Sequence, residues 1–128
     1  MTTDFQKTLP AGEYYIGDPC YVMPTRDWNQ WMDDHMCATN GQWVIHPTHC
    51  GDGWFIGSDG FEYHVDSGNL GMVLSSLCDP QKRTSVEQIG TFHAYTTDVV
   101  FSVYKHPTFT EFWFSDTKGD DVIKIITQ

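Results

Sequence analysis

The sequence predicts a mainly-β (α+β) domain, a twisted antiparallel sandwich or partly closed barrel with one helix packed on it. Short apolar runs recur along the chain between turns that contain Gly, Pro or Asp, as is typical of β architectures. A single segment, beginning near Thr25, has the length and periodicity of a helix. The pair Asp59-Gly60 joins two alternating segments, which predicts a β-hairpin.

The strands follow from period-two alternation and from the turn residues that bound them. No repeat, linker or low-complexity tract interrupts the chain, so we expect one β-rich domain over residues 1–128. A short helical turn is expected over 84–89. The predicted strands are 12–16, 20–23, 43–46, the two arms of 53–66, then 70–74, 92–95, 99–104, 109–114 and 122–126.

The predicted helix has Thr25 as its N-cap and Asp27 in its first turn, where the helix dipole favours an anion. No Gly or Pro follows until Gly41. Spacings of three and four place large side chains on one face, and such a stripe is more often core than a cofactor site. Its members are Trp28, Trp31, Met32, His35 and Met36.

The Asp59-Gly60 pair predicts a two-residue type I′ turn, because both central positions of that turn need a positive φ. A two-residue loop places Trp54 opposite Val65 and Ile56 opposite Tyr63, which makes them the core face. The expected core face is Trp54, Ile56, Ser58, Phe61, Tyr63 and Val65, with Phe55, Glu62 and His64 on the other face.

The last two strands are expected to form a second hairpin, with Lys118-Gly119 at its tip. This turn places Phe112 against Ile125 and Phe114 against Ile123 on the buried side. The same turn is rich in Asp, but it lacks the alternating ligands and closing Glu of a calcium loop.

The formal net charge is −10, from 17 acidic and 7 basic residues. Binding to nucleic acid through phosphate contacts needs Lys and Arg, so this composition argues against it. It argues equally against an anionic membrane surface. An acidic surface suits a basic protein partner, a metal ion or mimicry of nucleic acid, and the simplest alternative is that the charge only maintains solubility.

No apolar run reaches the length of a membrane span and the N-terminal residues do not resemble a signal peptide, so we expect a cytoplasmic protein. Its cysteines are Cys20, Cys37, Cys50 and Cys78, and they form no Cys-x-x-Cys pair. In a reducing compartment we expect all of them to be free thiols.

Three motifs in this chain are Gly17-Asp18-Pro19-Cys20-Tyr21, Gly51-Asp52-Gly53-Trp54 and Val65-Asp66-Ser67-Gly68. Over roughly residues 9–75 the chain resembles small uncharacterised bacteriophage and bacterial proteins with a Gly-Asp-Pro-Cys-Tyr signature. The resemblance implies a phage or mobile-element setting and a compact β-rich fold, but no reaction. His46-Pro47-Thr48-His49-Cys50 is not part of that pattern, so the resemblance implies nothing about it.

Asp18, Asp52 and Asp66 each occupy a Gly-flanked turn at a predicted strand end. If they converge, they could bind Mg²⁺ or Ca²⁺ or divide acid and base roles. The alternative is structural, because Asp side chains often accept hydrogen bonds from nearby backbone. For Asp18 we favour that alternative and expect acceptance from N–H groups of its own turn and of a neighbouring loop.

Two thiol hypotheses remain open beside these aspartates. Cys20 would be a nucleophile if a His or a helix N-terminus lowered its pKa, although Cys more often packs as a small apolar residue. A second group offers zinc ligands at a spacing that fits no standard site. It consists of His35, Cys37, His46, His49 and Cys50.

The sequence therefore favours a small acidic phage or mobile-element accessory protein that acts by binding a host or defence component. No catalytic residue, metal or cofactor is predicted. The alternative is a small metal- or thiol-dependent hydrolase, and a structural or assembly role also stays open. The candidate binding residues are Asp18, Cys20, Tyr21, Asp52 and Asp66.

Overall fold

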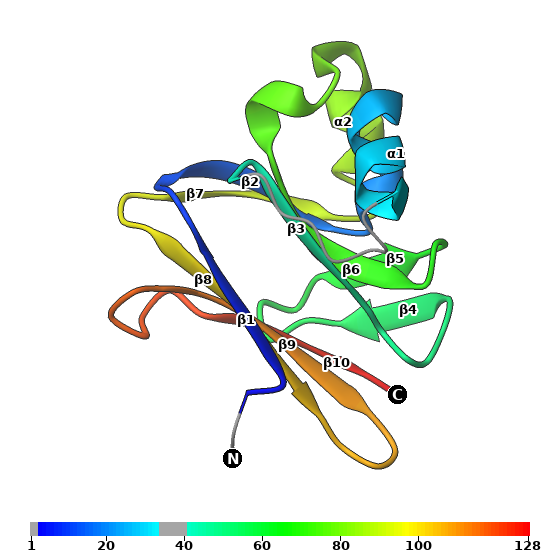
Figure 1. Ribbon diagram of the computed structural model, residues 1–128, viewed down its shortest axis with the longest axis vertical. Helices are drawn as coiled ribbons and strands as arrows, with labels where there is room; N and C mark the ends of the chain where they lie inside the picture. Colours follow the sequence, from blue (N-terminus) through cyan, green and yellow to red (C-terminus); the bar gives the residue numbers. More distant parts are fainter. Residues whose placement is uncertain (1–2, 34–40) are drawn as a thin grey trace.

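The computed structural model describes residues 3–33 and 41–128 and consists of three layers (Figure 1). Two four-stranded antiparallel sheets pack face to face, and short helices cover the far side of the second sheet. A two-stranded hairpin closes one side of the sandwich. This arrangement confirms the predicted sandwich with a packed helix, and the two four-stranded sheets do not close into a barrel.

The strands divide among three sheets. Sheet A has the order β1 (Phe5–Leu9), β8 (Val99–Lys105), β9 (Thr110–Asp116) and β10 (Ile123–Thr127). Sheet B has the order β3 (Trp43–Pro47), β6 (Asn69–Leu74), β2 (Gly12–Gly17) and β7 (Thr91–Tyr95). The hairpin consists of β4 (Gly53–Ile56) and β5 (Glu62–Val65).

The helical layer follows from two breaks in the β pattern, and each break contains an Asp-Pro pair. Asp18-Pro19 and Asp79-Pro80 each begin a 3-10 turn in which the Asp side chain caps the first free amide. The predicted strand 20–23 is therefore wrong. The elements of the layer are η1 (Pro19–Tyr21), α1 (Thr25–Asp33), η2 (Ser75–Leu77), η3 (Pro80–Lys82) and α2 (Arg83–Val86).

Sheet B is buried on both faces, because consecutive side chains of β2 enter different cores. Tyr14 and Ile16 pack between the two sheets, whereas Tyr15 packs under the helices. The hydroxyl of Tyr15 donates to the carbonyl of Val86 at 3.1 Å, which joins sheet B to α2. The strand that ends at Gly17 is thus held firmly from both sides.

Helix α1 presents a different face from the predicted stripe. Trp31 is buried and Trp28 is half-buried, but Met32 is exposed. Asp27 is buried instead, and its Oδ1 accepts from Trp43 Nε1 at 3.3 Å. An Asp that receives this hydrogen bond can replace an apolar residue on the inner face. His35, Met36 and Cys37 lie outside the described residues.

The C-terminal hairpin has the predicted register. Phe112 pairs with Ile125 and Phe114 pairs with Ile123, and all four side chains are buried. Strand β1, which the sequence did not predict, pairs with β8 at the edge of sheet A. Its middle residues are polar and exposed, so its pattern carried little strand signal.

The predicted register of the β4–β5 hairpin is wrong by one residue. Phe55, Tyr63 and Val65 are buried in the core, whereas Trp54 and Ile56 are 71% and 63% exposed. The observed pairs are Gly53–Val65, Trp54–His64, Phe55–Tyr63 and Ile56–Glu62.

The cause is the length of the loop. The carbonyl of Gly57 accepts from the Gly60 amide at 2.9 Å, and the amide of Gly57 donates to the Phe61 carbonyl at 2.8 Å. Among the residues of this loop, only Gly60 has a positive φ, +83°. This geometry corresponds to a type I turn followed by a bulged Gly, a three-residue loop. One additional loop residue moves every side chain of β4 to the opposite face.

We expect Gly60→Ala to destabilise the fold by about 1–2 kcal/mol, the usual cost of a left-handed conformation for an L residue. A Cβ at Gly60 would meet no atom within 4 Å, so crowding contributes nothing. Gly60→Asn should cost clearly less, because Asn tolerates this conformation. Urea unfolding of both variants measures this, and equal costs would contradict the assigned loop.

Candidate functional site

The carboxylate of Asp18 is fully buried at the end of β2 and accepts four hydrogen bonds. Its Oδ1 accepts from the Cys20 amide at 2.9 Å and from the Ser67 hydroxyl at 2.7 Å. Its Oδ2 accepts from the amides of Asp66 and Ser67, both at 2.7 Å. Asp18 therefore binds both its own turn and the loop between β5 and β6, as the sequence predicted.

Tyr21 adds a second connection between the same two segments. Its hydroxyl donates to Asp66 Oδ2 at 2.6 Å, and burial, followed by this hydrogen bond, raises the pKa of Tyr21. Ser67, which the sequence did not single out, is a direct partner of Asp18. The signal for it was present in the Val-Asp-Ser-Gly motif, but nothing local to that motif identifies Asp18 as its partner.

The three turn aspartates lie in one region but do not share a site. Asp18 points into the protein, whereas Asp52 and Asp66 are exposed. Asp52 lies beside the turn at Gly68, with its Oδ1 4.0 Å from the point that a Cβ on that glycine would occupy. Within residues 3–33 and 41–128, no group of three or more His, Cys, Asp or Glu side chains is placed to hold a metal ion.

Cys20 lines a groove of about 420 Å³ within the helical layer, between the η1 segment and the segment from η2 to α2. Burial, and secondly the Asp18 carboxylate, raise the pKa of its thiol, so little thiolate forms near neutral pH. Cys78 lines the same groove, and burial raises its pKa to about 11. Neither thiol has the environment of an activated nucleophile.

The zinc hypothesis concerns five residues, of which the structure describes three. The rings of His46 and His49 lie 5.5 Å apart, and burial lowers the pKa of both. The Cys50 thiol donates instead to the carbonyl of Thr127 at 3.4 Å. Of the four cysteines, the structure describes Cys20, Cys50 and Cys78, and these three form no disulfide with one another.

The outer face of the β4–β5 hairpin carries the two most exposed large apolar side chains of the described residues, Trp54 and Ile56. Their cross-strand neighbours are His64, whose ring stacks on Trp54 with centroids 5.0 Å apart, and Glu62. Asp52 and Asp66 follow directly beyond the Gly53–Val65 pair, at the open end of the hairpin. We call these six side chains the hairpin face.

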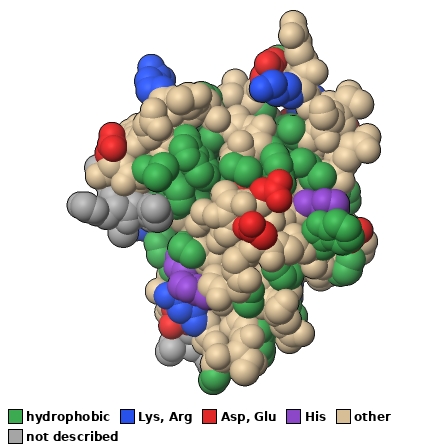
Figure 2. All heavy atoms as spheres, turned by 90° about the vertical axis from the view of Figure 1, so that its right-hand side faces the viewer, with side chains coloured by type: hydrophobic (Ala, Val, Ile, Leu, Met, Phe, Trp, Pro, Cys, Tyr) green, Lys and Arg blue, Asp and Glu red, His purple; other side chains and the backbone are tan. Residues whose placement is uncertain are grey.

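Figure 2 views the molecule from the side of the hairpin and of α1. Acidic side chains lie near the middle of this view, with hydrophobic groups on either side, and most of the Lys and Arg side chains lie away from them. The hairpin face combines exposed apolar side chains with neighbouring exposed carboxylates. The sequence did not predict this surface, because the expected register assigned Trp54 and Ile56 to the core.

We expect Asp18→Ala to destabilise the fold by about 3 kcal/mol, because it leaves three part-buried backbone amides without their acceptor. Asp18→Asn should cost clearly less, since its oxygen still accepts from Asp66 and Ser67. The matched control is Asp79→Ala, which removes only the local cap to Gln81 and should cost about 1 kcal/mol. Urea unfolding that gives equal losses for the two Ala variants would contradict a long-range role for Asp18.

Comparison with known protein families, with curated proteins and with solved structures finds no match for this chain. No helix in the described ranges has the length and apolar character that crossing a bilayer requires. The function therefore has to be inferred from the geometry of these surfaces and from the chemistry of the side chains on them.

Proposed function

We propose that this chain is a non-enzymatic accessory protein of a phage or mobile element, and that it acts by binding a host or defence protein. The observation that carries the proposal is the exposure of Trp54 and Ile56, at 71% and 63%, on adjacent outward positions of one strand. Single exposed apolar residues are ordinary on protein surfaces, but Trp is strongly enriched among the residues that dominate binding energy at interfaces.

The exposure of Trp54 is imposed by the fold and is not a sign of a loose strand. Phe55 and Tyr63 pack in the core on the opposite face of the hairpin. The Asp59 carboxylate accepts from the Tyr63 hydroxyl at 2.7 Å, and Ser58 donates its amide to Lys124 of β10 at 2.8 Å. A rigid hairpin that presents Trp54 to solvent loses little conformational entropy when a partner binds.

The alternative, a metal- or thiol-dependent hydrolase, has less support. The carboxylate of Asp18 is already occupied by four donors, so it is poorly placed to act as a base or ligand. The raised pKa of Cys20 disfavours a thiolate nucleophile. Asp52 and Asp66 remain accessible, and their exposure suits recognition of a partner by charge.

The test compares what immobilised variants capture from a lysate of host bacteria. Wild type and Ile126→Thr should retain the same protein, because Ile126 is an exposed apolar residue of β10 outside the hairpin face. The double variant Trp54→Thr/Ile56→Thr should lose it, with an unchanged melting temperature, since Thr suits exposed strand positions. Equal capture by the double variant, or no specific capture by wild type, would contradict the proposal.

A further inference from the structure

The charge of the hairpin identifies the chemistry of a partner. Residues 52–66 contain four acidic side chains and no Lys or Arg. Asp59 is engaged within its own loop, where it accepts from the Phe61 amide and the Tyr63 hydroxyl. Asp52, Glu62 and Asp66 are exposed around Trp54 and Ile56, and their negative charge has no compensating cation on this hairpin.

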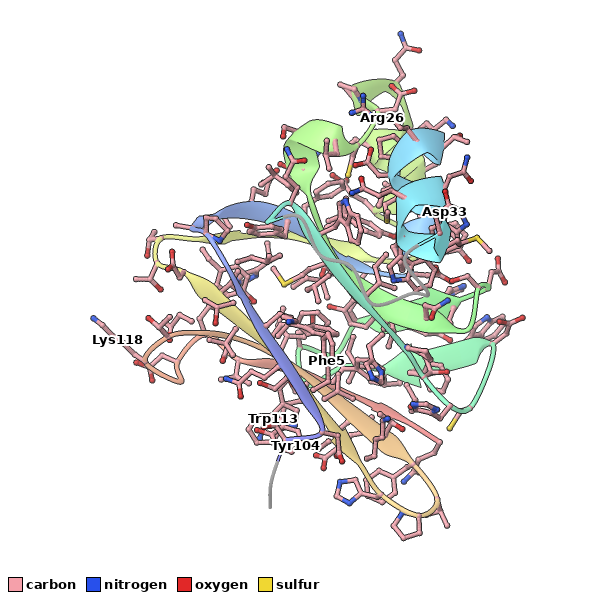
Figure 3. All side chains as sticks on the ribbon, in the orientation of Figure 1. Phe5, Arg26, Asp33, Tyr104, Trp113 and Lys118 are labelled. Carbon is pink, nitrogen blue, oxygen red and sulfur yellow. The ribbon has the colours of Figure 1, made fainter. Side chains whose placement is uncertain are left out.

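Trp54 also differs from a half-buried aromatic pair of the sandwich. On the outer face of sheet A, Tyr104 and Trp113 lie side by side (Figure 3), with ring centroids 4.9 Å apart. The ammonium of Lys124 already lies 4.0 Å from the centre of the Trp113 ring. Over the part of the chain that the structure describes, no Lys or Arg covers Trp54, and the ring that stacks on it is that of His64, with centroids 5.0 Å apart.

From these observations we infer that the hairpin face binds an arginine-bearing segment of a basic partner protein. This inference rests on the proposed function and specifies its partner. The guanidinium stacks on the exposed Trp54 ring and pairs with the carboxylates of Asp52 and Asp66, while an apolar neighbour covers Ile56. Arginine fits better than lysine, because its planar group both stacks on indole and binds carboxylate in a bidentate manner.

The same charge distribution disfavours the other occupants of such a face. A second copy of the chain would bring its own Asp52, Glu62 and Asp66 against these carboxylates, and like charges repel at an interface. Nucleic acid and anionic lipid present phosphates, which the three carboxylates also repel. A basic protein segment is the occupant that suits both the apolar side chains and the carboxylates of the hairpin face.

The test uses the full chain and short synthetic peptides of the pattern Gly-Arg-Leu-Arg-Gly, with Lys, citrulline or Glu in place of Arg. Citrulline is the matched control, because it keeps the shape of arginine without its charge. Binding is followed in NMR titrations through the backbone amide resonances of the β4–β5 hairpin, which every variant retains, and through the indole N–H of Trp54 in the chains that keep this residue. The Arg peptide should bind about tenfold more tightly than the citrulline peptide, and the Glu peptide should not bind.

Two variants localise the binding. Trp54→Thr and the triple variant Asp52→Asn/Glu62→Gln/Asp66→Asn should each weaken binding of the Arg peptide by about tenfold, whereas Ile126→Thr should not change it. Asn at position 66 still offers an acceptor to the Tyr21 hydroxyl, so the fold is preserved. Equal affinity for the Arg and citrulline peptides would overturn the inference.

The outcomes for the two proposals are separable. If lysate capture depends on Trp54 but the peptides show no preference for arginine, the partner is not basic and only this inference fails. If the Arg peptide binds as expected but no lysate protein depends on Trp54, the surface chemistry stands and the proposed function fails.

Discussion

The buried carboxylate of Asp18 is the interaction on which the arrangement of this surface depends. A charged group removed from water is tolerated only when hydrogen bonds replace its hydration, and here three amides and one hydroxyl do so. One donor lies in the turn that contains Asp18, and the others belong to Asp66 and Ser67, which follow Asp18 in the sequence by 48 and 49 positions. One side chain therefore fixes two loops against each other at the end of a strand that is buried on both faces.

Asp18 holds the loop that directly follows β5, so its hydrogen bonds also help to position the exposed residues of the β4–β5 hairpin. Fixing the amides of Asp66 and Ser67 sets where β5 ends and directs the Asp66 side chain outward to Tyr21. At the other end of the hairpin, the three-residue loop turns Trp54 and Ile56 to solvent. The hairpin face that we propose for binding is therefore held rigidly by the fold, and Asp18 supports it from inside the protein.

The sequence predicted those parts of the fold in which local pattern and packing agree. The pairing of Phe112 with Ile125 was predictable because one face of that hairpin is clearly apolar. In the β4–β5 hairpin both faces carry large apolar groups, so alternation could not choose between Phe55 and Trp54. The Asp-Gly pair also occurs both in two-residue and in three-residue hairpin loops, so it does not decide the register by itself. The role of Asp18 in its own turn was readable from Asp-Pro, but its partner Ser67 was not, because that contact is made only by the tertiary fold.

Hydrogen exchange of the backbone amides of Asp66 and Ser67, measured residue by residue in NMR, tests this account most directly. If the Asp18 carboxylate holds both amides in a buried network, they should exchange as slowly as amides of the central strand β6 and far more slowly than the Gln81 amide, which an exposed Asp79 caps. Exchange of Asp66 and Ser67 at the rate of Gln81 would contradict the claim that Asp18 fixes this loop.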